Sequence, residues 1–157
     1  MIGQLNTDDI ETLLHQSVLG RIGYGDGKRI YIVPISYIYD GRYIYCHTHE
    51  GLKTAILRKN TSVCFEVEQL ENQANWQTVV AHGDFEELTD PLLRMDALQK
   101  LNARRLPFIT SQTTRLTEEW PFASETLEKL PGVTFRIMLT SKTGRFEKAT
   151  QLAEAFF

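Results

Sequence analysis

The chain has 157 residues, 42% of them hydrophobic, a length that favours one domain over residues 1–157 with a single core. Seventeen basic and 20 acidic residues leave a net charge of −3, which gives no global electrostatic case for binding nucleic acid. The chain has neither the basic start and apolar run of a signal peptide nor the roughly 20 apolar residues of a membrane span, so we expect a cytoplasmic protein that does not bind membranes.

The first predicted element is an N-terminal helix within residues 1–17. Asn6 or Thr7 can cap this helix, and leucine and isoleucine residues follow at helical spacing. Two strands should then fill residues 19–39, on either side of the hairpin signal Asp26-Gly27. We expect the helix to brace the sheet and not to carry chemistry.

The second of these strands, which begins at Ile30, is apolar on both of its faces. That pattern indicates a strand in the centre of a barrel or at a dimer interface. Pro34 lies inside the strand and cannot donate a backbone hydrogen bond, so one side of the strand must be unpaired, bulged or at an edge there. Such a gap in a sheet can hold a ligand.

Asp40-Gly41 predicts a second hairpin, which leads into a strand over residues 43–49 and then directly into a short helix. The first turn of this helix carries Gly51 and Lys53, and Asn60 is a reasonable stop for it. A helix start exposes backbone N–H groups and partial positive charge, and a lysine there is locally unfavourable without an anion. The junction is therefore a candidate phosphate site.

The remaining elements are a strand over residues 62–68, a loop over 69–75, a strand over 76–89, a helix that begins at Asp90-Pro91, and a closing strand over 133–140. Residues 106–121 show no clear period, and 141–157 are expected to form a tail that ends in a short amphipathic helix. Antiparallel strands joined by hairpins favour a mainly β fold, a small closed barrel over residues 18–140 with helices as caps.

Several short motifs resemble those of the pyridoxamine 5′-phosphate oxidase-like flavoproteins, and more narrowly the short branch that includes nitroimidazole-resistance proteins. The resemblance covers residues 18–89 well and continues weakly to Arg136. The motifs that carry it are Val33-Pro34-Ile35-Ser36-Tyr37, Tyr39-Asp40-Gly41, Tyr45-Cys46-His47, Gly51-Leu52-Lys53 and the run from Arg58 to Val67. The resemblance implies a split β-barrel that forms a homodimer, with FMN in a groove between the two subunits.

It also implies which residues bind FMN. The backbone of the segment Val33, Pro34, Ile35 and Ser36 would pass along the isoalloxazine ring and the ribityl chain. The phosphate would be held by His47, Thr48, His49 and Lys53, where Thr48 offers a hydroxyl and Lys53 a charge. Arg21, Thr78 and Arg136 would come from facing strands or from the other subunit. The candidate phosphate site thus becomes the phosphate end of a flavin site.

The leading functional hypothesis is an FMN-dependent oxidoreductase that takes hydride from NAD(P)H and reduces a small acceptor such as a nitroaromatic, a quinone or another flavin. No catalytic residue is assigned. Oxidation of vitamin B6 is not expected, because the closing strand holds Arg136-Ile137-Met138 and no later histidine, where the family's oxidases carry an Arg-x-His motif.

Two further functional readings stay open. One is a non-catalytic flavin-binding or stress-sensing module, and the other is haem binding on the same barrel through His47, His49 or His82. His47 and His49 share a strand face and would need a third ligand to hold a metal, and we expect no metal site. The two cysteines, Cys46 and Cys64, lie in strand-like runs and are expected to be free thiols.

Overall fold

The computed structural model describes residues 1–104 and 127–149. Residues 106–121 and the amphipathic helix expected at the end of the tail lie outside the described residues. The described helices and strands are β1 (Ile2–Gln4), α1 (Thr7–Gln16), β2 (Leu19–Gly25), β3 (Ile30–Ser36), β4 (Ile38–Tyr39), β5 (Tyr43–Thr48), α2 (Leu52–Lys59), β6 (Ser62–Asn72), β7 (Asn75–Glu87), α3 (Pro91–Ala103) and β8 (Val133–Glu147).

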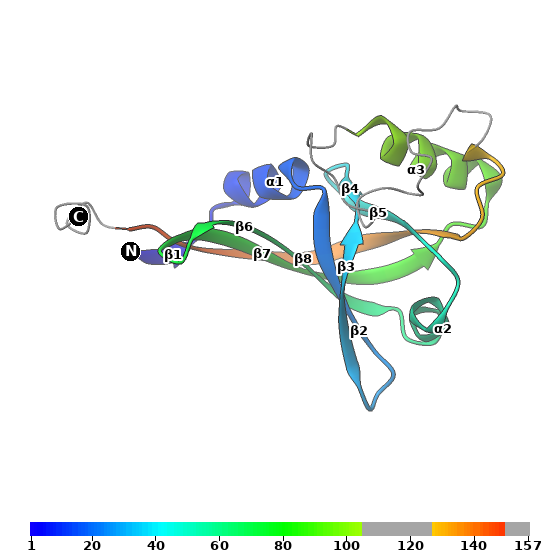
Figure 1. Ribbon diagram of the computed structural model, residues 1–157, viewed down its shortest axis with the longest axis horizontal. Helices are drawn as coiled ribbons and strands as arrows, with labels where there is room; N and C mark the ends of the chain where they lie inside the picture. Colours follow the sequence, from blue (N-terminus) through cyan, green and yellow to red (C-terminus); the bar gives the residue numbers. More distant parts are fainter. Residues whose placement is uncertain (105–126, 150–157) are drawn as a thin grey trace.

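All eight described strands belong to one antiparallel sheet, in the order β3-β2-β6-β7-β8-β5-β4, with β1 added beside β8. Figure 1 shows the long strands β6, β7 and β8 running together, the β2–β3 hairpin extending away from them, and α2 and α3 near the opposite end from the N-terminus. The mainly β fold with peripheral helices is therefore confirmed.

The sheet does not close into a barrel. Within the described residues, β3 forms a ladder only with β2, and β4 only with β5. The expectation of a closed barrel was wrong, and the split architecture implied by the family resemblance is the correct one. Pro34 contributes to the opening because it offers no N–H to a strand that would pair with the outer side of β3.

The position of β3 at the sheet edge also corrects the expectation of a central strand covered on both faces. Ile35 packs inward and is 4% exposed, whereas Ile30 and Ile32 on the outer face are 83% and 70% exposed. The apolar pattern had two explanations, and only the burial of this face in a dimer interface remains. That burial stays a prediction.

Two segments expected to be irregular are strands. β6 and β7 continue through residues 69–75 and leave a two-residue turn, where the Asn72 side chain accepts hydrogen bonds from the Ala74 backbone at 2.9 Å and from the Asn75 side chain at 3.0 Å. β8 extends to Glu147, between β7 and β1. The expected tail therefore begins seven residues too early, whereas the N-terminal helix begins as expected, at Thr7 with Asn6 as its cap, after the short strand β1.

These errors share a physical cause. The outer ends of β6 and β8 carry few buried side chains, so their sequences lack the alternation of apolar and polar residues that identifies a half-buried strand. These outer ends are extended because they pair with neighbouring strands, and the residues of those strands lie elsewhere in the chain.

Helix α3 begins as predicted, with Asp90 as cap and Pro91 as the first helical residue. The Asp90 carboxylate accepts hydrogen bonds from the backbone N–H groups of Leu92 at 2.8 Å and Leu93 at 3.2 Å. We expect Asp90→Ala to lower the free energy of unfolding by about 1 kcal/mol, the usual contribution of such a cap. Urea denaturation followed by circular dichroism measures this change, and an Asp90→Asn variant that keeps the acceptor should lose less.

Candidate functional site

The opening in the sheet lies where β3 approaches β5 and where α2 begins. β5 pairs with β4 only through Ile44 and Tyr45, so its last three residues leave one edge unpaired within the described chain. The outer edge of β3, including the segment Val33–Ser36, is likewise without a strand partner there. Two unpaired strand edges and a helix start therefore adjoin this opening, and ligand binding there remains a prediction.

Lys53 lies in the first turn of α2, and its ammonium group donates a hydrogen bond to the Thr48 hydroxyl at 3.0 Å. None of the ion pairs in the described part of the chain involves Lys53. The side chain is partly withdrawn from water, and this burial lowers the pKa of Lys53. A bound anion would restore the stability of this charge.

The backbone at the start of α2 leaves room for a ligand. A Cβ atom added to Gly51 would meet nothing within 4 Å. The Gly51 N–H is bonded to the Thr54 hydroxyl at 3.1 Å, and the Gly51 carbonyl accepts the first helical bond, from Ala55, at 3.1 Å. The next amides, of residues 52–54, donate to no acceptor among the described residues, as is usual in a first helical turn. The helix start is confirmed, and its binding of phosphate remains a prediction.

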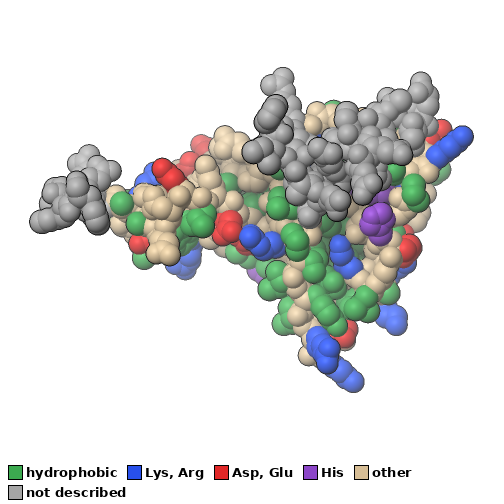
Figure 2. Space-filling view, in the orientation of Figure 1, with side chains coloured by type: hydrophobic (Ala, Val, Ile, Leu, Met, Phe, Trp, Pro, Cys, Tyr) green, Lys and Arg blue, Asp and Glu red, His purple; other side chains and the backbone are tan. Residues whose placement is uncertain are grey.

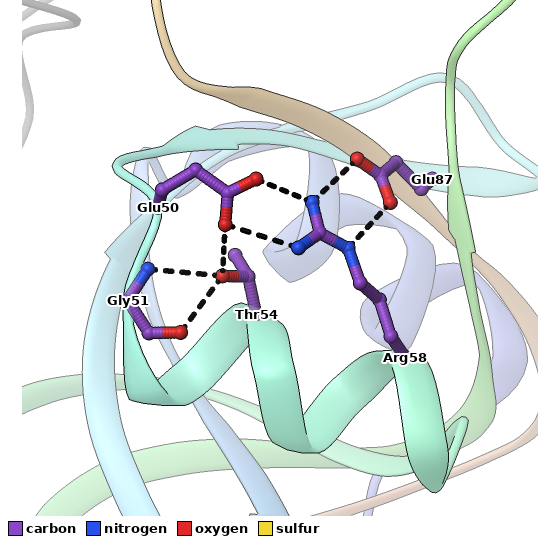
Figure 3. A network of polar contacts seen from close by, with 5 residues as sticks. All are labelled: Glu50, Gly51, Thr54, Arg58 and Glu87. Atoms are coloured by element: carbon purple, nitrogen blue, oxygen red, sulfur yellow. Dashed lines mark hydrogen bonds and ion pairs between the residues drawn. The ribbon is translucent and has the colours of Figure 1, made fainter.

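A charged network beside this helix start was missed by sequence reasoning. Arg58 lies between two carboxylates and bonds Glu50 at 2.6 and 3.0 Å and Glu87 at 2.8 Å through two nitrogens (Figure 3). Glu50, Thr54 and Arg58 follow one another at a spacing of four, which places them along one side of α2. The spacing of four could have predicted the contact between Glu50 and Arg58. No pattern in the sequence indicates the contact between Arg58 and Glu87 on β7.

The segment Val33–Ser36 is held by a residue that the sequence did not single out. Arg104, at the end of α3, donates hydrogen bonds to the Ser36 hydroxyl and, at 2.9 Å, to the Tyr37 carbonyl. Burial lowers the pKa of Arg104 to about 10. Arg104 therefore fixes the end of β3 beside the opening, while Pro34 lies on the outer face.

His47 uses both of its ring nitrogens within the chain. Nε2 lies 2.9 Å from the Pro131 carbonyl, which can only accept, so Nε2 carries the proton and Nδ1 accepts from the Thr134 hydroxyl at 3.0 Å. Burial lowers the pKa of His47 to about 4. In this geometry His47 has no nitrogen available for a phosphate, a metal or a haem iron. His49 lies near the start of α2 and is exposed.

The buried His47 predicts a loss of stability in acid. Its pKa is lower in the folded protein than the usual 6.5, so the unfolded chain binds the proton more readily, and stability is lost as the pH falls from about 6.5 towards 4. At pH 5.5 the loss from this residue should be about 1.4 kcal/mol relative to pH 8. His47→Gln should remove this part of the pH dependence in urea denaturation, and an unchanged pH profile would contradict the assignment.

Arg21 and Thr78 are brought together on the outer face of the sheet, through Glu66. Arg21 pairs with Glu66 at 3.0 Å, and the Thr78 hydroxyl donates to the same carboxylate at 2.8 Å. Arg136 lies elsewhere, paired with Glu86 at 2.7 Å and with its guanidinium 4.1 Å from the centre of the Tyr43 ring.

The strand register gives the separation of these groups. Glu66 lies opposite Val80 and Arg136 lies opposite Glu86, so the two sites are six residues apart along β7, roughly 20 Å at the rise of a strand. One chain therefore does not unite Arg21 with Arg136, and none of the contacts of Arg21, Thr78 or Arg136 in the described residues involves Lys53.

A groove of about 830 Å³ lies on the outer side of the β2–β3 hairpin and β6. The exposed side chains of Ile30 and Ile32 form part of its wall, together with Gly23, Cys64 and His82. Figure 2 shows hydrophobic side chains gathered over this hairpin, with basic side chains at its tip. Cys46 and Cys64 are free thiols, as predicted.

The described residues hold neither a cluster of metal-ligating side chains nor a membrane-spanning helix. No cluster of three or more histidine, cysteine, aspartate or glutamate side chains there could hold a metal ion. No helix there is both long and apolar enough to cross a membrane.

Several solved structures share the fold. A FAD-binding protein from Mesorhizobium loti has a TM-score of 0.73 and 25% identity, and the match covers 94% of this chain and 99% of that one. A candidate 5-nitroimidazole antibiotic resistance protein from Bacteroides thetaiotaomicron has a TM-score of 0.69 at 17% identity, with 93% and 87% covered. The flavocytochrome Anf3 from Azotobacter vinelandii has a TM-score of 0.66 at 14% identity, with 96% and 73% covered. At these identities the last two show the fold alone.

Sequence comparison extends the likeness. An uncharacterized protein of Rhizobium meliloti is 28% identical over 87 residues, a match that spans 50% of this chain and 58% of that protein. Residues 6–146 match the family described as pyridoxamine 5′-phosphate oxidase. This range includes the unpaired edge of β3, the start of α2 and most of β8, and the motifs in the sequence indicated the same relationship. The chain therefore belongs to the pyridoxamine 5′-phosphate oxidase family.

Proposed function

We propose that this protein binds FMN and serves as an FMN-dependent oxidoreductase. The observation that carries the proposal is Lys53, a half-buried cation in the first turn of α2 whose contact in the described structure is a hydroxyl and not a carboxylate. A phosphate monoester carries close to two negative charges at neutral pH and matches this combination of cation, hydroxyl and helix start. Family membership and the FAD-binding protein from Mesorhizobium loti support a flavin as the molecule that bears it.

The residues around the opening would divide the work of binding. Lys53 and Thr48 would hold the phosphate, and the unpaired backbone edge of Val33–Ser36 offers donors and acceptors to a flat, polar-edged ring. Arg104 keeps that edge in place through Ser36 and the Tyr37 carbonyl. The bound flavin would supply hydride transfer, and these side chains would bind and orient it.

We also propose that the protein is a homodimer whose subunits meet on the outer face of the β2–β3 hairpin. Ile30 and Ile32 are two large apolar side chains exposed side by side on an edge strand, next to a groove of ligand size. In such a dimer Arg21, Thr78 or Arg136 of one subunit would lie near the flavin of the other. Within one chain these three residues have no contact with Lys53 in the described structure, which is consistent with their acting across the interface.

The proposed reaction is the reduction of a small acceptor, such as a nitroaromatic or a quinone, by NAD(P)H. The closing strand carries Arg136-Ile137-Met138 and no later histidine where the family's oxidases have an Arg-x-His motif, which supports such an acceptor over a vitamin B6 substrate. No described side chain is assigned as an acid or base, because a bound flavin would supply the redox chemistry.

An absorption spectrum of the purified protein, followed by anaerobic titration with NADPH and NADH, tests the proposal. We expect flavin bands near their usual wavelengths, FMN on release by heat, and bleaching by one of the two nucleotides. Colourless protein that gains no flavin band when FMN is added would overturn it. Bound flavin that neither nucleotide reduces, with any acceptor, would favour the non-catalytic module instead.

A further inference from the structure

The residue just before the start of α2 is acidic. Glu50 precedes Gly51 directly and lies three residues before Lys53, so its carboxylate could reach the groups that would bind phosphate. The chain holds this carboxylate away from those groups, a role that rests on the proposed binding of the FMN phosphate at Lys53.

The Glu50 carboxylate is directed along α2 and away from its start. Both of its oxygens bond Arg58, at 2.6 and 3.0 Å, and one of them also accepts from the Thr54 hydroxyl at 3.0 Å (Figure 3). Thr54 and Arg58 lie on the same side of the helix, one turn apart. Lys53 is offset from Thr54 by about 100° around the helix axis and bonds Thr48 instead.

Arg58 is itself held in place by a second carboxylate. Glu87, on β7, bonds the Nε and Nη2 atoms of Arg58, both at 2.8 Å. Glu87 and Glu50, in that order, raise the pKa of Arg58 above its usual value, so this guanidinium stays charged. The planar guanidinium group is thus fixed from the side of the sheet, and its other N–H groups donate to Glu50. A lysine could not reproduce this geometry.

Without Arg58, the carboxylate would have better partners at the helix start. Acidic side chains are stabilised next to first-turn amides, and the amides of residues 52–54 have no other acceptor in the described structure. The Lys53 ammonium lies within the same turn and forms no ion pair there. A released Glu50 would therefore occupy the groups that bind phosphate and repel the phosphate itself.

We propose that Arg58 is a positioning residue, which holds the Glu50 carboxylate out of the phosphate site and so maintains the preference for a phosphorylated flavin. The role is specific to the phosphate. It predicts an effect on FMN that riboflavin, which has the same ring and ribityl chain without the phosphate, does not share.

The test compares the dissociation constants of FMN and riboflavin, by fluorescence quenching, in Arg58→Gln, Glu50→Gln and the double variant. Arg58→Gln should weaken FMN binding by about tenfold and riboflavin binding by less than about twofold. Adding Glu50→Gln should return FMN binding to within about threefold of the parent, since the competing carboxylate is gone. Lys59→Gln, which removes an exposed charge next to Arg58, is the matched control and should leave the ratio of the two constants unchanged.

Several outcomes would overturn the proposal. Equal weakening of both flavins in Arg58→Gln would show a merely structural role, and failure of Glu50→Gln to restore FMN binding would show that Glu50 is not the competitor. If Arg58→Gln does not fold, Glu50→Gln alone decides: it should bind FMN as tightly as the parent or more tightly, and a tenfold loss of FMN relative to riboflavin would refute the idea.

Lys53→Gln in the same assay separates this proposal from the one on which it rests. If Lys53→Gln lowers the preference for FMN and Arg58→Gln does not, only the role of Arg58 is wrong. If Lys53→Gln leaves the preference unchanged, the phosphate does not bind at Lys53 and the proposed site fails.

Discussion

Lys53→Glu should reduce the affinity for FMN by at least about a hundredfold, while the protein stays folded. The substitution replaces an attraction between the lysine and a phosphate carrying nearly two charges with a repulsion, and each such interaction contributes about 1 to 4 kcal/mol in partly exposed surroundings. A total of about 2.7 kcal/mol corresponds to a hundredfold change in affinity. Titration of apoprotein with FMN, followed by quenching of flavin fluorescence, measures the loss directly.

Lys59→Glu is the matched control for this experiment, because it makes the same change of charge on the same helix at an exposed position, the last helical residue. It should alter the affinity for FMN by less than about threefold, since a screened charge two turns away contributes little. Both variants should keep the parent melting temperature within a few degrees. Retention of parental FMN affinity by Lys53→Glu would remove the basis of the proposed site.

The parts of the fold that could be predicted from sequence are those fixed by bonds between near neighbours. Asn6 accepts from the Asp9 backbone at 2.8 Å, Asp26 bonds the amides of Lys28 and Arg29, and Asp40 bonds those of Arg42 and Tyr43. Each cap or turn is written within three residues of sequence. The start of α2 and the proximity of Thr48 to Lys53 likewise depend on residues that are close together in the sequence.

What could not be predicted depends on contacts between distant parts of the chain. Arg104 reaches Ser36 across 68 residues, and His47 reaches Pro131 across 84. No local pattern marks either pair, so His47 was interpreted as a phosphate ligand although the fold uses it to join β5 to the segment before β8. The outer half of β8 was missed for the same reason, because its strand partners, β1 and β7, both lie far before it in the sequence.

The candidate site was therefore predicted in part. Its centre, at Thr48, Gly51 and Lys53, is local and is where the sequence placed it. Its surroundings, Arg58 with Glu87 and Arg104 with Ser36, are long-range and were not anticipated. These surrounding contacts fix the orientation of the central residues. Composition and spacing alone do not determine that orientation.

Ile32→Asp should convert the proposed dimer into a monomer. Ile32 is 70% exposed in the single chain, and burial of such a side chain contributes about 1.5 to 3 kcal/mol. A twofold interface contains each residue twice, so the substitution removes two apolar contacts and brings two carboxylates into an apolar surface. We expect the dimer dissociation constant to rise by at least about a hundredfold, which sedimentation equilibrium can measure.

Leu92→Asp is the control, because Leu92 is an apolar residue that is at least as exposed, at 82%, but lies on α3 and outside the wall of the groove. It should leave the oligomeric state unchanged. Measuring the affinity for FMN in the same samples connects dimer formation to cofactor binding. If residues of the partner complete the flavin site, Ile32→Asp should weaken FMN binding although Lys53 and Thr48 are intact. This loss should diminish as a higher protein concentration drives the variant back into dimers. A parent protein that is monomeric at all concentrations, with FMN bound, would instead place the whole flavin site within one chain.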